Sequence, residues 1–574
     1  MGFRRRICLI VAALVAATIL VPAASAKPCD PRLLSCAPDL GWAKDLEEKI
    51  GAHIWDGQVY ELDFGFNDDG TVSDQVTRVT HYGDSALWTG TYLASQSFRY
   101  ATAKHYLSKP TLPVAERIFW TKTKAQAKAR VADMVRKYEI LVNISREWNH
   151  GFEPSLEQPG FGGGLIAGEP GYLMRACHDI AVPEYQRWSN AELGIGDPDA
   201  PPAPYTKKRR VFGPFPWTNA DGSVSQYYCE NGTSRDAYAG ATFGLQTAFD
   251  LVGVDDPAIR TRTATDLVTL SNFAFKYLWS TPRPHGRISL PLDEAEPVTG
   301  MNCSQFNAAY PPACGHDFEN FISPLFVITP MARMNMALGA KHVAPAVSLA
   351  ETARWEAIFA EEFATQGPVL AFSMEFDSIE PHVSYYKHNL SHLIGYDLGM
   401  RAPTAAHRLL FKQAVGAMDN TTGDDLNAHF EAITYALTGE TSRLEAAIQH
   451  LREWRDYRTR IESEAVTNNS QFCGTTLDCV EKDRREVYPP AGDPIVIEGS
   501  SGDKRAHFPL PVARRAPSDF IWQREPIKLD GAEALNHRAP GIDYLLPYWM
   551  IRYHTEVAKP ALEPFPAWPG NSYN

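Results

Sequence analysis

Four acidic residues stand where acid–base catalysis could use them, because each lies just before or in the first turn of an apolar, helix-like segment. They are Asp84, Asp236, Asp317 and Glu319. Hydrolysis of a glycosidic bond needs a protonated carboxyl group beside the leaving oxygen and an ionised carboxylate that acts on water or on the sugar. A helix N-terminus favours the ionised form. We therefore predict Asp84 or Asp236 as the base and Glu319, slightly further into its helix, as the acid.

The same positions also have a structural interpretation. An aspartate before a helix commonly caps it by accepting a hydrogen bond from a backbone N–H group of the first turn. Asp84, Asp236 and Asp317 could each act in this way. Because asparagine caps a helix about as well as aspartate but cannot act as a base, an Asp→Asn substitution separates the two interpretations.

A second group of residues suits a different reaction. Removing the proton beside a uronate carboxyl group needs a His or Tyr base, together with cations that stabilise the enolate. Arg235, His316, Tyr386 and His388 have this chemistry. A polysaccharide lyase is therefore an alternative to a glycoside hydrolase, with His388 as a candidate catalytic residue.

Aromatic and polar side chains near these positions could hold a glycan, since aromatic rings stack on sugars. The predicted substrate-binding residues are Trp88, Arg235, Tyr238, His316, Asp317, Tyr386 and Asn389. A non-catalytic scaffold that binds glycan or peptide is a third interpretation, because a binder needs the aromatic groups but no acid–base pair.

A metal site has a weaker basis. His388 and His392 are four residues apart, which places them on one face of a helix, as in many zinc sites. The residues between them are Asn-Leu-Ser, so the glutamate of the zinc-protease motif is missing. We expect no metal and no cofactor.

Helices must position these groups, and helical periodicity dominates from Asp84 to about Arg460. In several of these segments a polar start is followed by an apolar helix, so an array of hairpins would bring the polar starts together on one rim. The predicted helices span 85–105, 122–147, 169–178, 183–193, 234–253, 256–279, 317–338, 343–366, 384–401, 403–419, 423–438 and 441–461. Asp255-Asp256-Pro257 offers an N-cap followed by a proline at the first helical position.

Four segments carry this pattern most clearly: GDSALWTGTYLA, GTSRDAYAGATFGL, GHDFENFISPLF and SYYKHNLSHLIGYDL. On these segments the chain resembles the secreted (α/α)6 toroids, a group that includes many glycoside hydrolases and some polysaccharide lyases. The resemblance covers about residues 83–460. It implies a mainly α fold of six antiparallel helical hairpins that acts on a glycan.

The rest of the chain divides around this region. We predict a signal peptide at 1–26, an arm with short strands at 27–82, the helical toroid at 83–461 and an irregular, disulfide-stapled tail packed on it at 462–574. Two insertions, 194–228 and 280–315, are rich in proline and should be irregular loops.

Composition places the protein outside the cell. Arg4-Arg5-Arg6, an apolar run and Ala24-Ser25-Ala26 fit a cleaved export signal. Eight cysteines then remain, and their even number predicts disulfides 29/36, 303/314, 473/479 and 177/229. Losing three arginines takes the formal charge from −13 to −16, which disfavours binding to nucleic acid or anionic membranes. We expect a secreted protein without stable membrane insertion.

Overall fold

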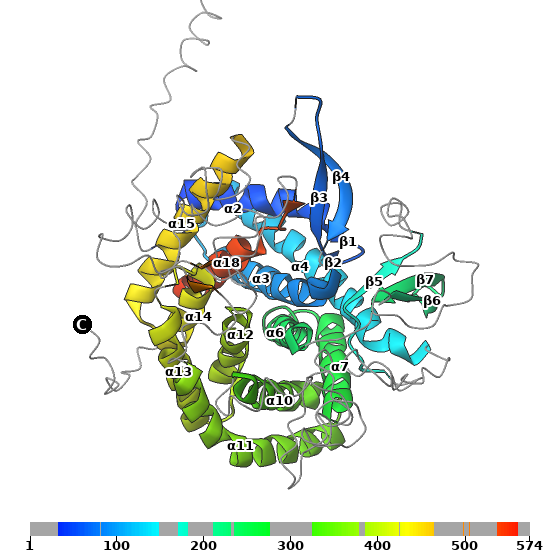
Figure 1. Cartoon of the computed structure of the whole chain (residues 1–574), viewed down its shortest axis with the longest axis vertical. Helices are drawn as coiled ribbons and strands as arrows, with labels where there is room; N and C mark the ends of the chain where they lie inside the picture. Colours follow the sequence, from blue (N-terminus) through cyan, green and yellow to red (C-terminus); the bar gives the residue numbers. More distant parts are fainter. Residues whose placement is uncertain are drawn as a thin grey trace, which may run out of the picture.

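The computed structural model describes residues 33–69, 71–80, 82–147, 170–181, 211–230, 235–275, 324–377, 385–423, 425–463, 497–498, 504–505 and 537–560. Over these residues the protein is mainly helical, with a few small sheets (Figure 1). This confirms the predicted fold class at that level. In the described part of the chain, no helix combines the length and apolar character needed to span a membrane.

The long helices follow one another in pairs. They are α2 (Ala37–Lys49), α3 (Ser85–Leu107), α4 (Val114–Asn143), α6 (Arg235–Leu251), α7 (Pro257–Phe273), α10 (Pro324–Val343), α11 (Leu349–Asp377), α12 (Tyr385–Arg401), α13 (Ala405–Thr422), α14 (Ala428–Thr438), α15 (Thr441–Ser463) and α18 (Ile542–Glu556). Helix α3 packs on α4, α6 on α7, α10 on α11, α12 on α13 and α14 on α15. Figure 1 shows α11 and α13 on the outside of the molecule, with α10 and α12 inside them.

Local chemistry explains several helix ends. Asp256 caps α7, because its side chain accepts hydrogen bonds from the N–H groups of Ala258 and Ile259. The helix begins at Pro257, so the predicted cap and first-position proline are both confirmed. Asn427 caps α14 in the same way, and Gly439 ends that helix in the left-handed conformation.

The inner helices α6, α10, α12 and α14 run in the same direction, because their contacts advance together along the chain. Gln246 donates to Asp397, and four residues later on both helices Asp250 accepts from Arg401. Thr242 of α6 contacts Met336 of α10, and further along both helices Asp250 contacts His342. His392 stacks on Phe430, and seven residues later on both helices Gly399 lies against Leu437.

Helices α3 and α6 approach so closely that their backbones touch. A Cβ atom placed on Gly90 would lie 2.1 Å from the carbonyl oxygen of Gly240, and one on Gly244 would lie 2.4 Å from the carbonyl oxygen of Gly90. The axes of packed helices usually lie about 8–10 Å apart, and only small residues at the contact allow helices to reach the short end of that range. The two helices therefore form a rigid pair at the centre of the core.

Adding one methyl group to this contact should be destabilising. We expect Gly90→Ala to lower the free energy of unfolding by about 1–3 kcal/mol, because the Cβ would meet backbone rather than a movable side chain. Gly41, inside α2, is the matched control: a Cβ there has no atom within 4 Å. Gly41→Ala should stabilise by roughly 0.5–1 kcal/mol through helix propensity. Denaturant unfolding gives the free energy of unfolding of both variants. Equal changes in the two would contradict a backbone contact at Gly90.

Two small sheets flank the start of α3. In the first, β3 (Glu61–Phe66) and β4 (Val72–Thr80) form a hairpin within the arm that was predicted to contain short strands, and β10 (His537–Arg538) extends it. In the second, β7 (Val224–Glu230) pairs with both β5 (Ala176–Asp179) and β6 (Val211–Thr218). Minor elements complete the list: β1 (Ile54–Trp55), β2 (Gln58–Val59), β8 (Ile497–Glu498), β9 (Lys504–Arg505), η1 (Ile50–His53), η2 (Tyr82–Asp84), η3 (Ile144–Glu147) and η5 (Ala344–Ala346).

Two predictions about elements were wrong. The helix predicted at 169–178 ends instead in strand β5, and the insertion predicted to be irregular at 194–228 contains β6 and most of β7. The predicted helix 183–193 and the insertion at 280–315 lie outside the described residues.

The C-terminal region also differs from the prediction. Residues 542–556 form α18, which packs against α3 and α14 as a full member of the helical core. Glu47 of α2 ties these elements together, because its carboxylate accepts hydrogen bonds from Tyr92, Gln96 and Arg99 of α3 and from Trp549 of α18. Residues 542–556 are therefore not part of an irregular tail, and this segment completes the core.

The predicted disulfide between Cys177 and Cys229 is confirmed, with an S–S distance of 2.06 Å. It crosses from β5 to β7 at directly paired positions. The other three predicted pairs each include cysteines outside the described residues.

Candidate active site

Asp84 and Asp236 lie at the same end of two adjacent, parallel helices. Leu87 of α3 contacts Gly240 of α6, and Gly90 contacts both Gly240 and Gly244, so the contacts advance together along both helices. Asp84 is three residues before Leu87, and Asp236 is four residues before Gly240. Each carboxylate is thus about one turn N-terminal to the first contact, since a helical turn takes about 3.6 residues.

Helix α12 begins at the same level. The pair Gln246–Asp397 sets its register against α6, and counting ten residues back along both helices gives Asp236 and Lys387. Tyr386, His388 and Asn389 therefore lie beside the level of the two aspartates. The predicted polar helix starts of α3, α6 and α12 share one end of the helical core.

The Asp84 side chain does not cap its helix. Asp84 precedes α3 with φ −102° and ψ 0°, and its carboxylate accepts no hydrogen bond from the first-turn N–H groups. Asp256, by contrast, has the extended backbone of a capping residue and accepts two such bonds. The structural interpretation of Asp84 as a cap is therefore not supported, and its side chain is half-buried at the start of α3.

Asp236 and Asn389 are buried polar side chains with hydrogen-bonding atoms that the described residues do not pair. Asp236 is 2% exposed, and its Oδ1 atom has no hydrogen-bond partner among the described residues. Asn389 is fully buried, and neither its Oδ1 nor its Nδ2 atom has a partner in the same part of the chain. A buried polar group without a hydrogen bond costs about 1–3 kcal/mol, so each of these side chains has hydrogen-bonding capacity that the described residues do not use.

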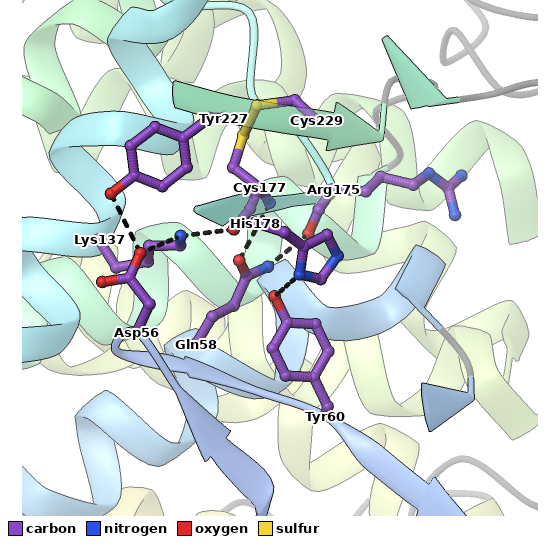
Figure 2. Close-up of a disulfide and its surroundings, with 9 residues drawn as sticks. All are labelled: Asp56, Gln58, Tyr60, Lys137, Arg175, Cys177, His178, Tyr227 and Cys229. Atoms are coloured by element: carbon purple, nitrogen blue, oxygen red, sulfur yellow. Dashed lines mark hydrogen bonds and ion pairs between the residues drawn. A yellow bond between two sulfur atoms is a disulfide. The ribbon is translucent and has the colours of Figure 1, made fainter. Parts of the chain in front are cut away.

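Arg175 is a member of this site that the sequence did not reveal. Its Nη1 atom donates a hydrogen bond of 3.1 Å to the carbonyl oxygen of Gly83, the residue before Asp84. Figure 2 shows the guanidinium group pointing away from the neighbouring disulfide. Glu230, also buried, lies opposite on β7, and its carbonyl oxygen accepts from the Arg175 backbone N–H group at 2.9 Å. A guanidinium group thus lies beside the start of α3.

Strand β5, which begins directly after Arg175, is held by buried contacts with Lys137 (Figure 2). Lys137 of α4 is fully buried and donates to both the Asp56 carboxylate, at 2.9 Å, and the Cys177 carbonyl oxygen. Burial lowers the pKa of Lys137, and the neighbouring Asp56 carboxylate only partly offsets this effect. Although burial opposes ionisation, Lys137 and Arg136 lower the pKa of Asp56. The Lys137 hydrogen bond to Cys177 links β5 to α4, and its ion pair with Asp56 links α4 to the turn between β1 and β2.

The remaining predicted residues fall into two groups. Trp88 and Tyr238 are buried in the core, and the Tyr238 hydroxyl donates to the Gly171 carbonyl oxygen at 3.1 Å, so neither ring is exposed for sugar stacking. The other group is not described in the structure. It comprises Glu319, His316 and Asp317, which lie outside the described residues, and the side chains of Arg235, Tyr386 and His388.

The second histidine of the possible metal motif is used in packing. His392 is fully buried, and its ring stacks on Phe430 at a centroid distance of 4.0 Å. Within the described ranges, no group of three or more His, Cys, Asp or Glu side chains is arranged to hold a metal ion.

No family model, curated protein or solved structure matches this chain. The functional conclusion therefore depends on the site. Two aspartates at one level, with a guanidinium group at the backbone carbonyl that precedes one of them, form an arrangement that could move a proton and stabilise charge at an adjacent bond.

Proposed function

We propose that this protein is a secreted glycoside hydrolase that cleaves a polysaccharide or oligosaccharide with Asp84 and Asp236 as its catalytic carboxyl pair. One group would activate water or attack the sugar, and the other would protonate the leaving oxygen. The observation that carries the proposal is the register of α3 against α6, because it puts both aspartates about one turn before the same interhelix contact.

We also propose the finer architecture, an (α/α)6 toroid. Contacts between successive inner helices support it: α3 packs on α6, α6 on α10, α10 on α12, α12 on α14, α14 on α18, and α18 back on α3. The shared direction of α6, α10, α12 and α14 is what such a fold requires, with the active site on the rim where these helices begin.

A polysaccharide lyase is the second candidate. The observation in its favour is the register of α12 against α6. Counted along that register, Tyr386, His388 and Asn389 at the start of α12 lie at the level of the aspartates. His or Tyr could remove the proton beside a uronate, and the Asn389 amide could hydrogen-bond the uronate carboxyl group.

Purified protein incubated with a panel of neutral and acidic polysaccharides tests the proposal. New reducing ends without ultraviolet absorbance from an unsaturated uronide would identify a hydrolase, and both signals together would identify a lyase. Binding without either signal would favour the glycan-binding scaffold. Asp84→Asn protein is the matched control in each assay.

A further inference from the structure

We propose that the cavity between α2 and α4 is a second ligand site, which binds a sugar acid of the uronate type. The cavity has a volume of about 420 Å³. Small-molecule sites usually measure about 300–1,000 Å³, so it is large enough for one sugar ring. Helices α2 and α4 form its walls, and Arg99 of α3 and Trp549 of α18 form its buried floor.

This cavity is separate from the proposed catalytic carboxyl pair. Arg99 is 15 residues after Asp84 along the continuous helix α3. Because an α-helix rises 1.5 Å per residue, the two positions are roughly 22 Å apart along the helix axis. The inference therefore goes beyond the proposed function and does not depend on it.

The floor of the cavity holds a cation in a fixed position. Arg99 is 7% exposed, and its guanidinium group donates to the Glu47 carboxylate at 3.2 Å and to the Gln126 side-chain oxygen at 3.3 Å. Trp549 lies beside it, with the guanidinium carbon 5.8 Å from the centre of the indole ring. The Nε atom of Arg99 has no hydrogen-bond partner among the described residues. The floor is therefore preorganised and has one N–H donor that these residues do not use.

The α4 wall adds two cations, Lys122 and Arg130. Neither forms an ion pair or a hydrogen bond with a side chain in the part of the chain that the structure describes. Four cationic and three acidic side chains line the cavity, and one of the acidic groups, Glu47, is already paired with Arg99. The cavity thus has a surplus of positive charge in a chain whose formal net charge is −13. Cations in such a setting favour a ligand with a carboxylate group, which accepts strong hydrogen bonds from them.

The remaining lining suits a hydroxylated ring better than a hydrocarbon chain. Phe119 contributes a partly buried aromatic ring, on which the C–H face of a sugar can pack. The oxygen of Gln126 is used by Arg99, so its amide N–H groups remain as donors, and Asp133 adds a carboxylate acceptor. A purely apolar ligand would remove water from these polar groups without replacing its hydrogen bonds. A sugar acid matches both the cations and the polar groups.

Titration of the purified full-length protein with sodium glucuronate, followed by calorimetry and ligand-observed NMR, tests the proposal. We expect saturable binding of glucuronate at millimolar concentrations and weaker binding of glucose, which has a similar ring without the carboxylate. Arg130→Met should raise the Kd for glucuronate about tenfold or more, because it removes a charge-assisted hydrogen bond. Arg117→Met is the matched control, since Arg117 lies on the same helix outside the cavity and its loss changes the net charge equally.

A second pair of variants leaves every charge in place. Ala129 is exposed on α4 and lines the cavity, so Ala129→Trp should fill the cavity and abolish glucuronate binding without unfolding the protein. Ala125 is also exposed, one turn earlier on α4 and outside the cavity, so Ala125→Trp should bind glucuronate with the wild-type Kd. Asp84→Asn should do so as well, because that residue belongs to the separate proposed catalytic site.

Three results would overturn the inference. They are the absence of saturable glucuronate binding, glucose binding as tight as that of glucuronate, and glucuronate binding that survives Ala129→Trp. A loss of binding in Asp84→Asn would also contradict it, because the bound sugar acid would then lie at the proposed catalytic site. The proposed function is tested separately by polysaccharide cleavage, so the two can fail independently.

Discussion

Asp84→Asn protein is expected to fold normally and to lose two or more orders of magnitude in turnover. Asparagine keeps the size of the side chain and its capacity to cap a helix, but it cannot act as a base or nucleophile. Since Asp84 makes no capping hydrogen bond, even the small stability change of a lost cap is not expected. Initial rates of reducing-sugar release and a thermal unfolding curve measure the two effects on the same sample.

Asp256→Asn is the control for this substitution. Asp256 is a working cap, at the start of α7, so the variant should retain both stability and turnover. Asp236→Asn should lose turnover as Asp84→Asn does, and the double variant should be little worse than either single one, because the two groups act as a unit. Full activity of both single variants would show that neither aspartate is catalytic.

The largest effect on stability is expected at Arg401, which lies inside the helical core. Its guanidinium group is 8% exposed and forms ion pairs with Asp250 of α6 and Asp397 of its own helix. It also donates to Thr247. Arg401→Met would leave the fully buried Asp397 carboxylate without its cation and the partly exposed Asp250 carboxylate with His342 as its remaining partner. We therefore expect unfolding to become easier by about 3–5 kcal/mol.

This loss should depend on pH in a defined direction. Burial raises the pKa of Asp397 to about 6, so its contribution to stability is present below pH 3.8 and lost as the pH rises through 6. Burial also opposes ionisation of Asp250, but Arg401 and His342 lower its pKa to about 2, so its contribution is present above pH 3.8 and lost as the pH falls through 2. Without Arg401 both pKa values rise, and the deficit of the variant should grow from about pH 4 to 7.

Denaturant titrations of Arg401→Met at several pH values test this prediction. Arg262→Met is the control, because the Arg262–Glu139 pair is 3.6 Å long and about 40% exposed, so its loss should cost at most about 1 kcal/mol. Adding Asp250→Asn and Asp397→Asn to Arg401→Met should recover much of the lost stability. A deficit that is the same at pH 4 and pH 7 would contradict the assignment.

The helices were predictable where local signals coincide. The start of α7 at Asp256-Pro257 was fixed by a cap and a proline, and α3 and α6 follow polar starts with long apolar runs. Strand β5 was missed because its partner, β7, is about 50 residues away, and pairing at that distance has no local pattern. Helix α18 was missed because it contains Pro547 and is buried on almost every side, so no polar face marks its period.

The candidate site shows the same division. Asp84 and Asp236 could be proposed from residue type and position, because each stands at a helix start. Their common level could not, since it is set by backbone contacts between Gly90, Gly240 and Gly244. Arg175 carried no signal in the sequence, because its place beside Gly83 depends on the pairing of β5 with β7.

The packing of α18 on α3 has a consequence for how the chain reaches its native state. Trp549 hydrogen-bonds Glu47 across 502 residues, so the last helix of the core completes a surface laid down by the first ones. Contacts this far apart in sequence form late, since the intervening chain must first be ordered. During synthesis from the N-terminus, α3 would therefore expose an apolar face until residues 542–556 arrive. That interval is when chaperones or proteases would act on the nascent protein.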